Sequence, residues 1–202
     1  KGLEGTITRF RAPKWQPEVY ASGVRNSVGF DFHPTTHDLF FTDNGADNMG
    51  DDSPPDELNH APSAGLWFGF PWFGGGHDRT PDFAARPPPR PATFPAVAFG
   101  AHVAALGISF YAATRFPEAY RGDAFVAQHG SWNRSVPDGY RVARIRFDRN
   151  TNTALGWEVF ASGWLDAGGD AWGRPVDVKV TAAGDMLVSD DRAGAIYRIS
   201  YR

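Results

Sequence analysis

The 202-residue sequence contains no cysteine, which excludes disulfide bonds and metal sites built on thiolates. It has no apolar run approaching the roughly 20 residues that a membrane-spanning helix needs. The formal net charge is only −3, so no strongly basic surface is available for nucleic acid or anionic lipid. Helical periodicity is absent from any stretch longer than about ten residues. The sequence therefore argues against a membrane span, a nucleic-acid partner and a helical fold.

Turn-forming and strand-forming residues are abundant instead. The chain has 23 glycines and 16 prolines, and 14% of its residues are aromatic. Such a composition favours short strands joined by tight turns. The length suits one large all-β domain that can bury a core of its own.

An internal repeat is present. Residues 18–23 read EVYASG and residues 158–163 read EVFASG. Each is followed by an alternating strand, a turn, an apolar strand and a polar pair, and a weaker copy of this pattern lies at 106–129. Counted between Gly29, Gly107 and Asp177, the copies are roughly 70 to 80 residues apart, which is longer than a usual propeller repeat and implies inserted loops.

Repeated small antiparallel sheets are typical of propeller blades. The three copies predict an all-β fold with about three blades of a six-bladed β-propeller. We expect residues 1–202 to form a single partial propeller domain whose N-terminal blades are absent. The opening KGLE lacks a methionine and leads directly into a strand-like segment, which suggests a cut inside a longer protein or a processed product. Residues 61–100 are predicted as loop, with an extended polyproline segment at 86–91 on the surface.

The register of the repeat places polar residues at equivalent positions. Three cationic or potentially cationic residues precede the alternating strands, namely Arg25, His102 and Arg174. Three polar pairs end the following strands, namely Asp43-Asn44, Gln128-His129 and Asp190-Asp191. Equivalent positions in neighbouring blades converge on a propeller's central channel, and arginine forks bind carboxylates there. Any one of these residues alone is better explained by a turn or a buried salt bridge, but their shared register favours a site for an anion.

Residues 43–59 are rich in acidic residues and glycine. Carboxylate and carbonyl oxygens are the ligands that Ca²⁺ prefers. The spacing does not match an EF-hand, and a solvated acidic loop is the alternative interpretation.

Several motifs resemble those of the pyrroloquinoline-quinone (PQQ)-dependent sugar dehydrogenases. They are GVRNSVGF at 23–30, FTDNG at 41–45 and PDELN at 55–59. AHVAALG at 101–107 and QHGSWNRS at 128–135 look like the branch that contains L-sorbosone and soluble aldose sugar dehydrogenases, and GRPVDV at 173–178 with VSDD at 188–191 completes the series. The resemblance covers essentially the whole chain.

This resemblance implies a propeller that holds PQQ and Ca²⁺. The cofactor-binding residues that it implies are Arg25, Asn26, Asn44, His102 and Arg174. Arg25 would also be catalytic, stabilising the developing oxyanion at the quinone. The backbone carbonyls of Gly45 and Ala46 would ligate the Ca²⁺ ion.

The implied reaction is oxidation of an aldose or sorbosone-like sugar at C1, with electrons passed to an external acceptor. The family's general base lies in an earlier blade, so it has no counterpart here and the chain alone is expected to be inactive. The family's cofactor-contacting lysine is also absent, and Arg134 could replace it. The family's usual setting implies a periplasmic or secreted protein.

Two other functions remain open from the sequence. A propeller lactonase or hydrolase could hold a channel metal with Asp43, Asn44, Asp190 and Asp191, although it would not need Arg25 and Arg174. A non-catalytic propeller could bind glycans or proteins, with tryptophans such as Trp67, Trp72, Trp132 and Trp172 stacking on sugars. Whichever function holds, the open sheet edges and apolar flank of a half-propeller predict self-association.

Overall fold

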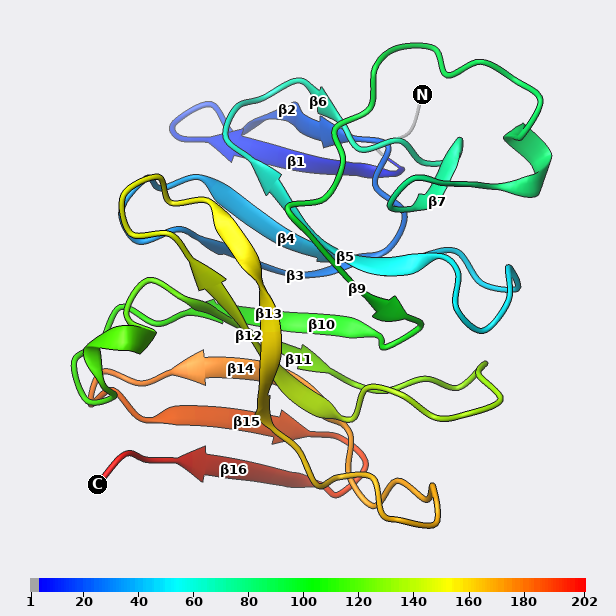
Figure 1. The fold of residues 1–202 in the computed structure, drawn as a ribbon. Coiled ribbons are helices and arrows are strands. Elements are labelled where there is room, and N and C mark those ends of the chain that lie inside the picture. The colour runs from blue at the N-terminus through cyan, green and yellow to red at the C-terminus, as the bar shows by residue number, and fades with distance from the viewer. Residues whose placement is uncertain (1–3) are drawn as a thin grey trace.

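The computed structural model describes residues 4–202, and these residues form sheets that follow one another from the N- to the C-terminal end of the chain (Figure 1). No α-helix occurs among them, and the helical turns at Pro81–Phe83 (η1) and Glu118–Tyr120 (η2) are short 3₁₀ segments. The expectation about the start of the chain concerns residues 1–3, which lie outside the described part. None of the helical segments in the described part could cross a membrane.

Two four-stranded antiparallel sheets form the centre of the molecule. The first contains, in spatial order, β3 (Ser27–Phe32), β4 (Leu39–Asp43), β5 (Pro55–Ala61) and β9 (Val97–Ala101). The second contains β10 (Ala105–Phe110), β11 (Ala124–Gln128), β12 (Arg141–Phe147) and β13 (Ala154–Ala161). Each has the up-and-down order of a propeller blade.

Incomplete sheets flank these two blades. On the N-terminal side, β1 (Thr6–Arg11) pairs with β2 (Gln16–Ser22), and the short β6 (Leu66–Trp67) runs parallel to β2. On the C-terminal side, β14 (Pro175–Val180), β15 (Met186–Asp190) and β16 (Ala195–Ile199) form a three-stranded sheet. A small hairpin of β7 (Phe73–Gly75) and β8 (Asp78–Arg79) lies in the long connection from β6 to β9.

The first strands of three successive sheets are neighbours, because β10 contacts both β3 and β14. This arrangement confirms the predicted fold of about three propeller blades. The repeated segment 18–23 lies at β2, and its copy 158–163 lies at the end of β13. Each of these strands follows its antiparallel partner along the chain. The sequence repeat therefore corresponds to a structural one.

Two repeat positions show why glycine is needed where inner strands approach each other. A Cβ atom on Gly29 would lie 2.9 Å from the Cα atom of Gly107, and one on Gly107 would lie 2.6 Å from the Cα atom of Asp177. Both distances are shorter than real Cβ contacts. Glycine at these two positions lets the backbones of the inner strands of adjacent blades pack closely.

The hydrophobic core lies between adjacent sheets. Side chains between the two central blades include Phe40, Leu58, Phe110, Val126 and Ile145. Side chains between the second blade and the C-terminal sheet include Tyr111, Phe125, Val142, Val178 and Val188. Apolar side chains of neighbouring sheets therefore pack against each other and bury surface between the blades.

The structure corrects one prediction and confirms another. Residues 61–100 are not all loop, because β9 completes the first blade by pairing with β5 and β6 to β8 also lie in this region. The predicted apolar flank is present: alternate side chains of β3, namely Val28, Phe30 and Phe32, are exposed by 51%, 64% and 52%. Self-association through this flank stays a prediction.

Candidate functional site

In two of the sheets, an aspartate at the end of the second strand holds the loop that precedes the first strand. Asp43 ends β4, and its carboxylate accepts hydrogen bonds from the backbone N–H groups of Arg25 at 2.9 Å and Asn26 at 2.6 Å. Asp190 ends β15 and accepts one from the N–H of Arg174 at 2.9 Å. In the pairs Asp43-Asn44 and Asp190-Asp191, the first residue therefore holds the backbone of the loop, and the second makes other contacts.

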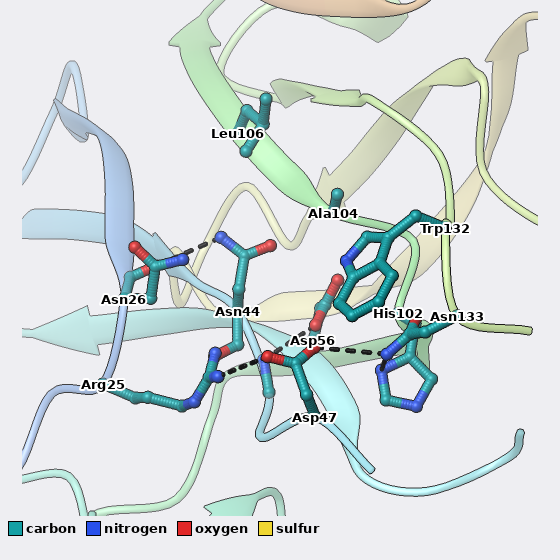
Figure 2. A pocket seen from close by; sticks show the side chains of 11 residues that line it. Arg25, Asn26, Asn44, Asp47, Asp56, His102, Ala104, Leu106, Trp132 and Asn133 are labelled. Carbon is teal, nitrogen blue, oxygen red and sulfur yellow. Dashed lines mark hydrogen bonds and ion pairs between the residues drawn. The ribbon is translucent and has the colours of Figure 1, made fainter. Parts of the chain in front are cut away.

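The loops at this end of the blades surround a cavity of about 190 Å³ (Figure 2). Five of the predicted site residues line it, namely Arg25, Asn26, Asn44, Gly45 and His102. The remaining lining residues are Asp47, Asp56, Ala104, Leu106, Trp132 and Asn133. Ligand pockets usually span about 300–1,000 Å³, so the described residues enclose only part of a cofactor-sized ligand.

Arg25 is held in the cavity wall by an ion pair. Its Nη2 lies 2.8 Å from Oδ2 of Asp47, and its Nη1 donates to the carbonyl of Asn44 at 3.1 Å. The side chain is 23% exposed, so its remaining N–H groups are available at the cavity. Asp47 reduces the positive charge at the site, and the anion attraction predicted from the sequence is correspondingly weaker.

The hydrogen bonds of His102 identify its tautomer. Its Nε2 lies 2.8 Å from the carbonyl oxygen of Gly50, which can only accept, so Nε2 carries the proton. Its Nδ1 then accepts from Nδ2 of Asn133 at 3.4 Å. The same amide nitrogen donates to Asp47 at 3.2 Å, which fixes its orientation and links His102 to the Arg25–Asp47 pair.

The loop after β11 is attached to the acidic loop after β4. The backbone N–H of Ser135 donates to Asp51 at 3.0 Å, and Arg134 forms an ion pair with Asp52 at 3.2 Å. Arg134 also donates to the carbonyl oxygens of Asp51 and Ala101. Its guanidinium is engaged in these contacts, so in this arrangement it does not reach the cavity as a substitute for the family's lysine.

Buried carboxyl groups lie behind the cavity. Oδ1 of Asp56 accepts from the N–H of Gly45 at 2.8 Å, and its Oδ2 accepts from the N–H of Ala105 at 3.3 Å. Burial raises the pKa of Asp56, raises the pKa of Asp43 to about 6 and raises the pKa of Glu57 to about 7, in each case against the opposing effect of hydrogen-bond donors. Asp43 and Glu57 are directly paired across β4 and β5.

The backbone at Gly45 and Ala46 is held through its N–H groups. Gly45 donates to Asp56, and Ala46 donates to the carbonyl of Gly74 at 2.7 Å. Neither the Gly45 nor the Ala46 carbonyl accepts a hydrogen bond from another described residue. Gly45 lines the cavity, whereas Ala46 follows it in the chain and is not part of the lining. Carbonyl oxygens without protein partners are of the kind that Ca²⁺ takes as ligands.

Arg174 does not line this cavity. Its guanidinium donates to the carbonyls of His129, at 3.1 Å, and Gly130, and it lies over the ring of Tyr140 at 5.4 Å. In this structure Arg174 therefore supports the start of the loop that carries Trp132, and direct contact with a cofactor stays a prediction.

The geometry does not support the channel-metal hydrolase. The carboxylates of Asp43 and Asp190 are both occupied by backbone N–H groups. Among residues 4–202, no group of three or more His, Cys, Asp or Glu side chains could hold a metal ion.

Sequence reasoning did not assign Asp47, Asp56 and Asn133 to the cavity. All three lie in motif segments or in the acidic stretch 43–59, so their positions carried a signal. The sequence could not predict the roles of these residues, because each one contacts a loop that is distant along the chain.

Fold and cavity together define a partial β-propeller with a polar site formed by loops at one end of its blades. A family model described as TrAA12-like matches residues 87–202. The chain belongs to the TrAA12-like family, and the family-level prediction made from the motifs is confirmed.

A longer relative is known from Borreliella burgdorferi. This protein, described as uncharacterized, is 40% identical over 199 residues, which are 98% of this chain and 52% of the relative. The chain thus spans about half the length of the curated relative that it matches.

Solved structures share the fold. The holo form of the PQQ domain of pyranose dehydrogenase from Coprinopsis cinerea aligns with a TM-score of 0.71 at 19% identity, covering 98% of this chain and 61% of that one. A calcium structure of a Trichoderma reesei carbohydrate-active enzyme of family AA12 aligns with a TM-score of 0.72 at 22% identity, covering 90% of this chain and 53% of that one. The apo form of the soluble aldose sugar dehydrogenase from Escherichia coli aligns with a TM-score of 0.67 at 17% identity, covering 97% of this chain and 54% of that one. These similarities establish the fold.

Proposed function

We propose that the chain is the cofactor-holding half of a PQQ- and calcium-dependent sugar dehydrogenase. The observation that carries this proposal is the convergence of Arg25, Asn26, Asn44, Gly45 and His102, from loops of two blades, on one cavity. The similar structures include the PQQ domain of a pyranose dehydrogenase, a calcium structure of a family AA12 enzyme and a soluble aldose sugar dehydrogenase, which supports the same activity. The substrate would be an aldose or a sorbosone-like sugar, and the electrons would pass to an external acceptor.

The cavity residues divide into two groups by chemistry. The Arg25 guanidinium would hold a partly negative oxygen and stabilise charge that develops on it. The amides of Asn26 and Asn44 would orient the ligand by hydrogen bonds, and Asn44 is itself fixed by a 3.1 Å bond from its Nδ2 to the carbonyl of Asn26. The carbonyls of Gly45 and Ala46 would hold Ca²⁺.

When bound, PQQ would supply a quinone able to accept a hydride from C1 of the sugar. The chain's own residues bind and orient, and none of them is proposed as general base. His102 is unsuited to that role because its Nε2–H is committed to Gly50 and its Nδ1 accepts from Asn133. We therefore expect no turnover by this chain without further blades.

A titration of the 202-residue chain with PQQ, with and without Ca²⁺, tests the proposal through the absorbance of PQQ. Saturable binding that requires Ca²⁺ is expected. Arg25→Ala should abolish it, while Arg9→Ala is the matched control, since Arg9 pairs with Glu18 on the exposed face of β1.

The longer Borreliella burgdorferi relative provides a second arm of the experiment. Binding only to the longer protein would assign essential contacts to blades outside this chain. If neither protein binds PQQ, or if binding is indifferent to Ca²⁺ and to Arg25→Ala, the proposal is wrong.

A further inference from the structure

Trp132 combines high exposure with a place in the cavity wall. Its exposed fraction is 73%, the highest among the chain's tryptophans, yet its side chain lines the same cavity as Arg25 and His102. Its indole makes no hydrogen bond and no aromatic contact with any residue in the described part of the chain. The indole therefore contributes little to packing and leaves a large apolar face open beside polar groups.

The backbone that carries Trp132 is nevertheless firmly held on both sides. Before it, the N–H of Ser131 donates to the carbonyl of Asp138 at 2.8 Å, and the hydroxyl of Tyr140 donates to the carbonyl of Ser131 at 2.5 Å. After it, Asn133 and Arg134 bind the acidic loop of the neighbouring blade. A fixed backbone that presents an uncommitted aromatic face is preorganised for a ligand, because little conformational entropy is lost on binding.

The cavity has two chemically different sides. Figure 2 shows Arg25 and Asn26 on one side, with Asn44 beside Asn26, and Trp132 across from them on the loop after β11. The first side offers charged and amide groups, and the other offers an apolar ring edged by His102 and Asn133. A sugar ring suits the apolar side of the cavity, since its C–H face packs on an aromatic ring while its hydroxyls stay free to reach polar groups.

We propose that Trp132 is the platform on which the pyranose ring of the substrate packs, and that it determines affinity for the sugar but not for the cofactor. This inference rests on the proposed dehydrogenase function, since it names the subsite that the sugar occupies.

Calorimetric titration of the 202-residue chain with three methyl pyranosides tests the proposal. The probes are methyl β-D-glucopyranoside, methyl β-D-galactopyranoside and methyl α-D-mannopyranoside, whose blocked C1 prevents oxidation so that only binding is measured. At least one should bind the wild-type chain, and Trp132→Ala should weaken it about tenfold, the loss of roughly 1.4 kcal/mol of stacking energy. Trp132→Phe keeps a flat apolar face and should restore part of the affinity.

Two comparisons make the test specific. Trp15→Ala removes another exposed indole, 64% accessible and outside the cavity, and should leave glycoside affinity unchanged. The affinity for PQQ with Ca²⁺, measured on the same proteins, should be the same in Trp132→Ala as in the wild type.

The possible outcomes separate this inference from the proposed function. Absence of binding by all three glycosides, or equal binding by Trp132→Ala, overturns the inference. Weaker PQQ binding with unchanged glycoside binding overturns it too and makes Trp132 a cofactor contact. Glycoside binding that depends on Trp132 in a chain that binds no PQQ would support the inference while the dehydrogenase proposal fails.

Discussion

Glu57 provides the sharpest test of the electrostatics behind the cavity. It is only 6% exposed, and its carboxyl group accepts hydrogen bonds from the N–H of Gly76 at 2.6 Å and from Nδ2 of Asn59 at 2.8 Å. Burial raises its pKa from 4.5 to about 7. As the pH rises, the carboxyl group of Glu57 ionises at a lower pH in the unfolded chain than in the folded one. The stability of the folded protein therefore falls as the pH rises from 4.5 to about 7 and stays low above that window.

The magnitude follows from the two pKa values. At roughly 1.4 kcal/mol per tenfold change in proton affinity, ionised Glu57 costs the folded state about 3 kcal/mol above pH 7. Glu57→Gln removes this cost. The amide oxygen can still accept from Gly76, and the amide nitrogen can donate to Oδ1 of Asn59, which is buried without a partner, once the Asn59 amide turns over.

Urea unfolding at pH 5 and pH 8, followed by tryptophan fluorescence, measures the effect. Glu57→Gln should be more stable than the wild type by about 3 kcal/mol at pH 8 and by less than about 1 kcal/mol at pH 5. Glu18→Gln, the same change at an exposed side chain on β2, should show no such gain. An equal effect at both pH values, or a loss of stability at pH 8, would refute a raised pKa at Glu57.

Three further results are expected. Gly107→Ala should lower the stability by about 1–3 kcal/mol in urea unfolding, because its Cβ meets the Asp177 backbone, whereas Gly168→Ala in a loop should not. Arg144→Ala removes an ion-pair partner of the Asp123 carboxylate, which is only 1% exposed. The substitution should lower the free energy of unfolding by about 3–5 kcal/mol, seen as a lower melting temperature. Phe30→Ser on the exposed flank should reduce self-association in sedimentation velocity; a wild-type chain that stays monomeric contradicts this expectation.

The strand pattern could be predicted because its causes are local. The alternating residues of β3 and β14 and the apolar run of β4 indicate strands by themselves, and the similar segments 18–23 and 158–163 reveal the repeat. The exceptions include β9, which lies after a proline-rich segment and exists because it pairs with β5. A non-local pairing of this kind leaves little trace in a short segment.

Part of the site could also be predicted from the repeat register. Arg25, Asn44 and His102 share a cavity because their loops lie at the same end of neighbouring blades. Arg174 has the same register but belongs to the next sheet, where it binds the carbonyls of His129 and Gly130 instead. Register therefore predicts the end of the blade at which a residue lies, but not which contact its side chain makes.

By itself, the sequence determined the strand repeat, the glycines at the close approach of inner strands, and the loops that carry the polar residues. These features depend on neighbours along the chain and on the period of the pattern. Only the tertiary structure decided that Asp47 pairs with Arg25, that Asn133 orients His102, and that Trp132 stays exposed in the cavity wall. Each of these depends on how loops tens of residues apart meet when the blades pack, a distance relation that no local pattern contains.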